Sequence, residues 1–301
     1  MSSSYAGEDS LKSVLALLPR RLAQRIALIS EGLSVEELRL RVARPLQIVA
    51  AEDELISELA PFSVDEAREL LERLCQHSVY AHADELRQGF VTLEGGARVG
   101  VCGKPAVERG EIVNLTEVYG FNIRIARQVT GCAKDAMRLI AEGGRAASTL
   151  IAAPPGGGKT TLLRDIMRCV SEGEGIKAQK VAAADERGEL AGCVSGVPSF
   201  DIGRRTDVMD RAPKSAAISL LIRSMSPEVI ITDEIGGPAD AAAIAEADRC
   251  GVTVIASAHA DTLDELRRRQ GIAPLFEGGV FKRVLMLKRR GSILRITPVL
   301  L

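Results

Sequence analysis

The segment that most constrains this chain is a glycine-rich loop in its second half. Residues 153–161 read Ala-Pro-Pro-Gly-Gly-Gly-Lys-Thr-Thr and follow the apolar run 149–152. They match the phosphate-binding pattern G-x-x-x-x-G-K-[ST] except at the first position, where Ala153 replaces glycine. Glycines let the backbone curl so that its N–H groups face a phosphate, with a helix N-terminus behind them. The sequence therefore predicts a strand, a phosphate-binding loop and a helix in succession.

Each residue of this loop has an expected role in binding ATP and Mg²⁺. Lys159 is expected to contact the β- and γ-phosphates, Thr160 to ligate Mg²⁺ and Thr161 to help hold the α-phosphate. The other cofactor-binding residues are Pro155, Gly156, Gly157 and Gly158. The competing interpretation is a flexible glycine turn that happens to precede Lys-Thr. The order of strand, loop and helix argues against that alternative.

A second element of this kind of site follows further along the chain. The apolar run 229–232 ends in two carboxylates, Asp233 and Glu234, which is the Walker B arrangement. We expect Asp233 to hold Mg²⁺ through its hydration shell and Glu234 to orient or activate water. The alternative is a solvated acidic loop.

Further polar residues follow other expected strands. Asp185 and Glu186 end the run 181–184, so Glu186 is a rival for water activation. Its alternative is a surface ion pair with Arg187. His259 also stands at a strand end, where it either senses the γ-phosphate as a hydrogen-bond donor or is merely a satisfied polar residue.

Four arginines are candidates for stabilising transition-state charge on a neighbouring subunit's nucleotide. Two lie in a loop expected over residues 203–207, and two flank the expected domain junction. The alternative for each is a solvated or ion-paired arginine. The candidates are Arg124, Arg127, Arg204 and Arg205.

The pattern along the chain predicts two domains. Residues 1–130 read as an α+β domain, with a helix near 18–26, a strand over 38–42, a capping box from Ser63 to Glu66 and a glycine-turned hairpin. Residues 131–301 alternate strands with helices, which indicates a mostly parallel sheet covered by helices. The predicted fold class is α/β, with a C-terminal RecA-like P-loop domain.

Composition argues against some classes of function. Lys plus Arg total 39 and Asp plus Glu total 40, and aromatic residues make up 3% with no Trp, so a basic surface with base-stacking platforms is not expected. The polar N-terminus does not read as a signal peptide. No run approaches the ~18 apolar residues that cross a bilayer. Because the six cysteines are scattered, we expect them to be small buried hydrophobic residues in a protein of the reducing cytosol.

With these motifs placed, the chain resembles the stage III sporulation AA family of ATPases, which is related to the type II and type IV secretion ATPases. The resemblance covers most of the chain. Its most specific pieces are residues 89–93, 98–103, 122–127, 185–192, 205–208 and 222–235.

The wider secretion-ATPase pattern is also visible. Its histidine box resembles residues 257–260, and its aspartate box, which supplies a catalytic glutamate, loosely resembles Asp185-Glu186. In its Walker B segment a glycine usually stands where Asp233 stands here, so the matched acid is Glu234. The resemblance therefore implies Glu234, Glu186, Lys159 and His259 as catalytic residues.

The resemblance further implies a hexameric, cytoplasmic mother-cell ATPase. Such an ATPase docks on a membrane complex between mother cell and forespore and acts as a motor or gate, with no nucleic acid expected. A competing function is a nucleic-acid-binding P-loop ATPase with an Arg-x-x-x-His signature, which Arg73 and His77 fit formally. A third is a structural ring component that turns nucleotide over slowly.

Overall fold

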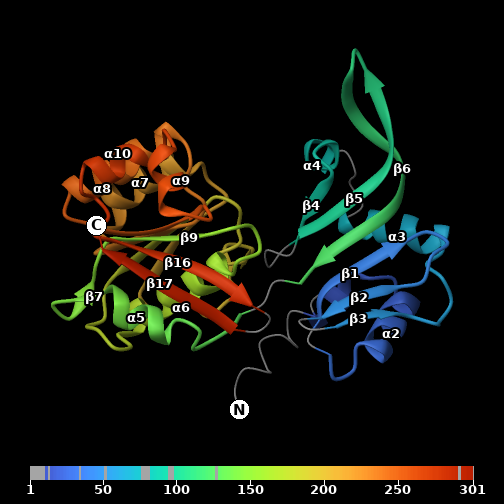
Figure 1. Cartoon of the computed structure of the whole chain (residues 1–301). Helices are drawn as coiled ribbons and strands as arrows, with labels where there is room; N and C mark the ends of the chain where they lie inside the picture. Colours follow the sequence, from blue (N-terminus) through green and yellow to red (C-terminus); the bar gives the residue numbers. More distant parts are fainter. Residues whose placement is uncertain are drawn as a thin grey trace. The chain divides into compact units, whose positions relative to one another are not determined.

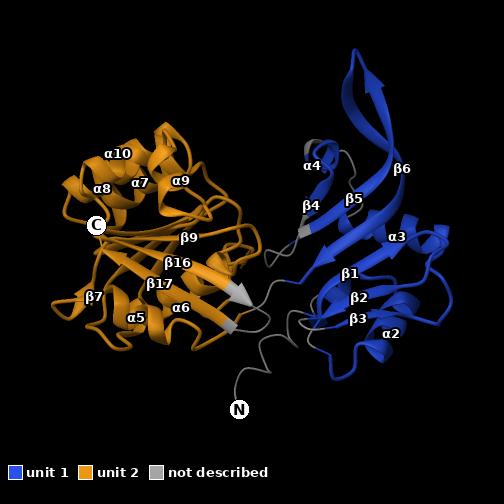
Figure 2. Ribbon diagram, in the orientation of Figure 1, with its two compact units in different colours: residues 1–127 blue, residues 128–301 orange. Residues whose placement is uncertain are grey.

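The computed structural model describes residues 11–12, 14–33, 35–50, 53–75, 82–93, 98–125, 128–290 and 293–300. Its internal contacts divide the chain into two compact units, residues 1–127 and 128–301 (Figure 2). Each unit has a hydrophobic core of its own. The domain division expected after residue 130 stays a prediction. No helix in the described ranges combines the length and apolarity that a membrane span requires.

Unit 1 is built on a six-stranded antiparallel sheet in the order β3-β2-β1-β6-β5-β4 (Figure 1). Alternate residues of β1, such as Leu38 and Leu40, are buried in a core shared with α2 and α3. Its elements are α2 (Arg20–Ile29), β1 (Val35–Arg41), β2 (Gln47–Ala50), β3 (Glu54–Ile56), α3 (Val64–Leu74), α4 (Ala83–Arg87), β4 (Phe90–Thr92), β5 (Arg98–Glu108) and β6 (Glu111–Arg124).

The structure contains the capping box and the hairpin that the sequence predicts in unit 1, as far as it describes their residues. Ser63 and Glu66 form the capping box: the Glu66 N–H donates to Ser63 Oγ (3.1 Å) and the Ser63 N–H donates to Glu66 Oε2 (2.9 Å). The expected hairpin is the antiparallel pair β4–β5, and its glycine turn at 94–97 lies outside the described residues. The expectation for cysteines is wrong in part, because Cys102 and Cys250 are exposed.

Unit 2 contains a seven-stranded sheet in the order β13-β10-β14-β15-β9-β16-β17, parallel except for β17. Its strands are β9 (Thr149–Ala153), β10 (Val181–Asp185), β13 (Thr206–Asp210), β14 (Val229–Thr232), β15 (Thr253–His259), β16 (Arg283–Arg290) and β17 (Ile293–Leu300). Its helices are α5 (Lys134–Ile140), α6 (Lys159–Glu172), α7 (Lys214–Met225), α8 (Pro238–Arg249), α9 (Leu263–Arg268) and α10 (Ala273–Glu277). Two short hairpins join β7 (Ala141–Glu142) to β8 (Arg145–Ala146) and β11 (Cys193–Val194) to β12 (Val197–Pro198).

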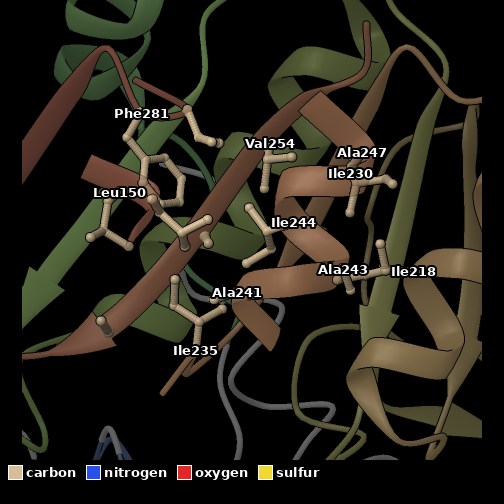
Figure 3. Close-up of a cluster of buried hydrophobic side chains, with 14 of the residues drawn as sticks. Leu150, Ile218, Ile230, Ile235, Ala241, Ala243, Ile244, Ala247, Val254 and Phe281 are labelled. Atoms are coloured by element: carbon tan, nitrogen blue, oxygen red, sulfur yellow. The ribbon is translucent and has the colours of Figure 1, made fainter. Parts of the chain in front are cut away.

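Helices cover both faces of this sheet, with α5 and α6 on one side and α7 to α10 on the other (Figure 1). Figure 3 shows the core beneath α7 and α8, where Ile218 and Ile244 meet strand residues such as Ile230 and Val254. The predicted parallel sheet with covering helices is confirmed. Because parallel strands share one carboxyl edge, the residues after β9, β10, β14 and β15 are brought to the same side of the sheet.

Candidate active site

The loop after β9 has a shape that its three glycines make possible. Gly156 and Gly158 adopt φ values of +72° and +84°, in the left-handed region that favours glycine. Gly157 is required for a different reason: a Cβ there would lie 2.6 Å from the Cβ of Ala153. Ala153 itself is the last residue of β9, where regular strand backbone suits alanine. The loop is therefore a compact cradle ahead of the N-terminus of α6.

Lys159 opens α6 and turns its side chain back into this loop. Its ammonium donates hydrogen bonds to the carbonyl oxygens of Ala153 (3.0 Å) and Pro154 (3.2 Å). It also lies 2.8 Å from Nδ1 of His259. Burial lowers the pKa of Lys159, and the charge of Glu234 opposes that shift. Thr160 and Thr161 follow in the first turn of the helix, both half-buried.

His259 connects the lysine to the Walker B acid. Its Nε2 lies 2.8 Å from Oε1 of Glu234, whose other oxygen forms an ion pair with Arg187. Since an ammonium only donates, Nδ1 of the neutral imidazole accepts from Lys159 and the Nε2–H donates to Glu234. One tautomer thus satisfies both contacts. The structure therefore brings together three of the four catalytic candidates, in the chain Lys159–His259–Glu234.

Asp233 is buried at the end of β14 without a hydrogen-bond partner for either carboxylate oxygen within the described residues. Burial raises its pKa to about 7, and the nearby charge of Lys214 works in the opposite direction. A buried carboxylate costs free energy unless something compensates it. A hydrated cation at the carboxyl edge of the sheet would supply that compensation.

These observations allow a test of whether Mg²⁺ with a nucleotide suits the site. The cradle around Gly157 would be filled by any larger side chain, and the Asp233 oxygens lack partners. The described residues contain no group of three or more His, Cys, Asp or Glu placed to hold a metal. Mg²⁺ bound mainly by phosphates, water and one hydroxyl needs no such group. The residues of this site therefore fit a nucleotide bound together with Mg²⁺.

The two carboxylates of the second acidic pair, Asp185 and Glu186, lie in different environments. Asp185 is fully buried and accepts backbone N–H groups of Glu189 (2.9 Å), Leu190 (3.0 Å) and Ala191 (2.9 Å), so it shapes the following loop. Glu186 is exposed and lies 3.5 Å from the ammonium of Lys214. The structure thus pairs Glu186 with Lys214, in contrast to the local pair with Arg187 weighed from the sequence.

Sequence reasoning missed Lys214. Its side chain is buried, and its ammonium donates to the backbone carbonyl oxygen of Glu234 (3.1 Å). One signal was available: a lysine in the first turn of a helix opposes the helix dipole, so a buried one needs acidic partners nearby. Arg187 and Ser257 were likewise not assigned roles beside Glu234.

Two of the arginine candidates lie at the far end of α6 from the cradle. Arg204 forms an ion pair with Glu172 (2.9 Å), and Arg205 donates to the carbonyl oxygen of Ser171 (2.9 Å). At ~1.5 Å per residue, α6 separates them from its own N-terminus by roughly 20 Å. The expected loop is shorter than predicted, since Thr206 already begins β13.

The remaining candidates lie in or near unit 1. Arg124 is exposed at the end of β6, and Arg127 lies outside the described residues. Of the Arg-x-x-x-His signature, Arg73 forms an ion pair with Glu69 one turn earlier in α3, and His77 lies outside the described residues.

Comparisons with known proteins agree with this architecture. A family model described as "Sporulation stage III, protein AA" matches residues 7–299. Stage III sporulation protein AA of Bacillus subtilis (strain 168) is 38% identical over 282 residues, which cover 93% of this chain and 88% of that protein. The sequence resemblance is thereby confirmed.

Solved structures share the fold at low sequence identity. The ATPase DotB of Yersinia pseudotuberculosis superposes with a TM-score of 0.65 at 12% identity, covering 93% of this chain and 78% of that chain. The pilus retraction motor PilT, solved with bound ADP, gives a TM-score of 0.58 at 14% identity and covers 91% of this chain and 82% of that chain. These likenesses confirm the predicted α/β fold class with its central, mostly parallel sheet.

Proposed function

The chain belongs to the sporulation stage III protein AA family, and on that premise we propose that it is a Mg²⁺-dependent ATPase. The observation that carries the proposal is the chain of contacts from Lys159 through His259 to Glu234. It joins the phosphate-binding loop to the Walker B acid across the carboxyl edge of the sheet. A buried lysine, an imidazole and a carboxylate in this order suit phosphoryl transfer to water.

The chain's own residues have separate tasks in this reaction. Lys159 exchanges its carbonyl and imidazole partners for the β- and γ-phosphates, whose charge it neutralises. Glu234 orients the attacking water, with Glu186 as the rival for that task. Bound Mg²⁺ would neutralise phosphate charge, held by the Thr160 hydroxyl and, through water, by Asp233. His259 keeps the Glu234 carboxylate in place and connects it to the position where the γ-phosphate would bind.

We further propose that the ATPase works as a ring, most simply a hexamer. Lys159 and Mg²⁺ leave transition-state charge uncompensated, and an arginine supplied by a neighbouring subunit is a common remedy. Arg204 and Arg205 contact the C-terminal end of α6, too far from its N-terminus to serve their own chain's loop, so they and the two unit 1 arginines are candidates for such a role. Family membership and the secretion-ATPase fold support a motor or gate, on the mother-cell side, for a channel complex between mother cell and forespore.

The proposal is tested by phosphate release from ATP, measured with Mg²⁺ and with a chelator, beside native mass measurement with and without ATP. We expect Mg²⁺-dependent release and a closed oligomer favoured by ATP. Absence of release from a folded, ATP-binding protein would support a nucleotide-binding ring component instead. Salt-dependent binding to single-stranded nucleic acid would favour the nucleic-acid alternative.

A further inference from the structure

Glu234 has an unusual backbone conformation for a residue that carries a side chain. Its φ is +41°, in the left-handed region that glycine adopts readily and glutamate does not. Such strain persists only where the surrounding structure holds it, and it gathers at functional sites.

Two buried side chains hold the backbone of Glu234 from opposite sides. The Glu234 N–H donates to Oγ of Ser257 in β15 (3.0 Å). The Glu234 carbonyl oxygen accepts from the ammonium of Lys214 at the start of α7 (3.1 Å). The N–H of Ile235 also donates to the Ser257 carbonyl oxygen (2.8 Å), so the turn is fixed on both of its peptide groups.

Lys214 has a second partner that makes it more than a support for one turn. Its ammonium lies 3.5 Å from Oε2 of Glu186, the rival candidate for water activation. The same ammonium therefore contacts the Glu186 carboxylate and the backbone carbonyl of Glu234, two residues that follow the neighbouring strands β10 and β14. Burying a lysine in the first turn of a helix is unfavourable unless its charge is compensated, and these acceptors compensate it.

We propose that Lys214 is a positioning residue: together with Ser257 it fixes the strained turn that directs the Glu234 carboxylate to His259, and it ties that turn to Glu186. The inference rests on the proposed ATPase function. It adds a residue from outside the P-loop and Walker B segments to the parts that set the reaction geometry. Loss of its ammonium would release the Glu234 carbonyl and let the turn relax.

The test compares Lys214→Met, which keeps an unbranched side chain as far as Cε and removes the ammonium, with Lys282→Met, a matched control at an exposed lysine. Because small misplacements of catalytic groups are costly, kcat for phosphate release should fall about tenfold to a hundredfold in Lys214→Met. The affinity for ATP should stay within about threefold, as expected when a group acts on the chemical step. Lys282→Met should match the wild type.

A second readout is independent of activity. Hydrogen–deuterium exchange of a peptide covering residues 229–236, in nucleotide-free protein, should be faster in Lys214→Met than in the wild type or Lys282→Met. If Lys214→Met does not fold, Ser257→Ala takes its place, with the same loss of kcat and the same faster exchange expected.

The outcomes separate this inference from the function on which it rests. A wild-type protein that binds ATP and releases no phosphate contradicts the proposed function, while the exchange experiment still tests the role of Lys214. An active wild type with unchanged kcat and unchanged exchange in folded Lys214→Met overturns the inference alone. A fall in ATP affinity that accounts for the whole loss of activity also overturns it, because Lys214 would then serve nucleotide binding.

Discussion

The ammonium of Lys159 lies 2.8 Å from Nδ1 of His259, and the opposite nitrogen of that ring lies 2.8 Å from Glu234. The group expected to neutralise phosphate charge and the group expected to handle water are thus separated by one imidazole. We expect a nucleotide that draws Lys159 to its phosphates to leave Nδ1 of His259 without this donor, on the ring whose other nitrogen contacts Glu234. The proposed function therefore predicts that nucleotide binding and the position of the Glu234 carboxylate are linked through His259.

His259→Ala should lower phosphate release about tenfold to a hundredfold, because Glu234 loses the donor that orients it. ATP affinity should change little, since Lys159 and the glycine loop that are proposed to bind the phosphates are unaltered. Turnover and ATP binding measured side by side check this. His82→Ala in unit 1, where His82 pairs with Glu85, is the control and should be silent. Equal losses of affinity and turnover in His259→Ala would contradict the expected role.

The two candidate acids can be separated by paired variants. Glu234→Gln should retain ATP binding and lose hydrolysis by about a hundredfold or more, because the amide no longer acts as a base toward water. Glu186→Gln should keep most of the turnover if Glu234 is the acid in question. Affinity and rate are needed for both. Loss of ATP binding in Glu234→Gln, or the binding-without-hydrolysis pattern in Glu186→Gln alone, would reassign the role.

The buried carboxyl of Asp233 should make stability depend on pH in the absence of Mg²⁺ and nucleotide. Burial raises its pKa from 3.8 to about 7, so the folded state binds more protons than the unfolded state between these values. Stability is therefore lost as pH rises from about 4 through 7. At about 1.4 kcal/mol per pKa unit, the loss is at most about 4 kcal/mol.

Asp233→Asn removes this cost, so it should stabilise the apo protein more at pH 8 than at pH 5, by at most about 3 kcal/mol. Chemical denaturation at both pH values, with a chelator present, measures the difference. Asp207→Asn on the exposed edge of β13 is the matched control and should show no such trend. Equal effects at both pH values would show that the carboxyl titrates normally.

A reaction completed between subunits should be rescued by mixing. If an arginine acts in trans, an equimolar mixture of Lys159→Ala with the variant lacking that arginine should regain some turnover, because one mixed interface pairs an intact loop with an intact arginine. Specific activity should also rise with protein concentration. The variants to test are Ala substitutions of Arg124, Arg127, Arg204 and Arg205. Concentration-independent activity without any rescue would place the whole site in one chain.

Much of the site follows from local patterns in the sequence. The strand, loop and helix around Lys159 are adjacent in the chain, and the acids after β10 and β14 reach one edge because parallel strands align their carboxyl ends. The sequence pattern did not predict the contacts of His259 with Lys159 and Glu234. The position of His259 at a strand end did predict that it lies at the same edge of the sheet as these residues. The same holds for the capping box at Ser63, where both partners lie within one turn.

Other features depend on contacts between residues that are far apart in the sequence, which local sequence patterns do not predict. Lys214 contacts the carbonyl of a residue 20 positions later, and the one local sign of a role is its place in the first turn of a helix. The edge strand β13 is polar and half-buried, so no apolar run or clear alternation marks it, and its first residues were read as loop. The hairpin β16–β17 and the long pair β5–β6 were also not identified. In each case tertiary pairing, more than local propensity, decides the structure.

The most direct test of the account is phosphate release by folded Lys159→Ala protein in the presence of Mg²⁺ and saturating ATP. Lys159 supplies charge to the phosphates and little to the core, so thermal unfolding should be near that of the wild type while turnover falls to background. Lys282→Ala, at an exposed lysine, should release phosphate at the wild-type rate. Wild-type phosphate release from the folded Lys159→Ala protein would contradict the claim that this loop binds and positions ATP for hydrolysis.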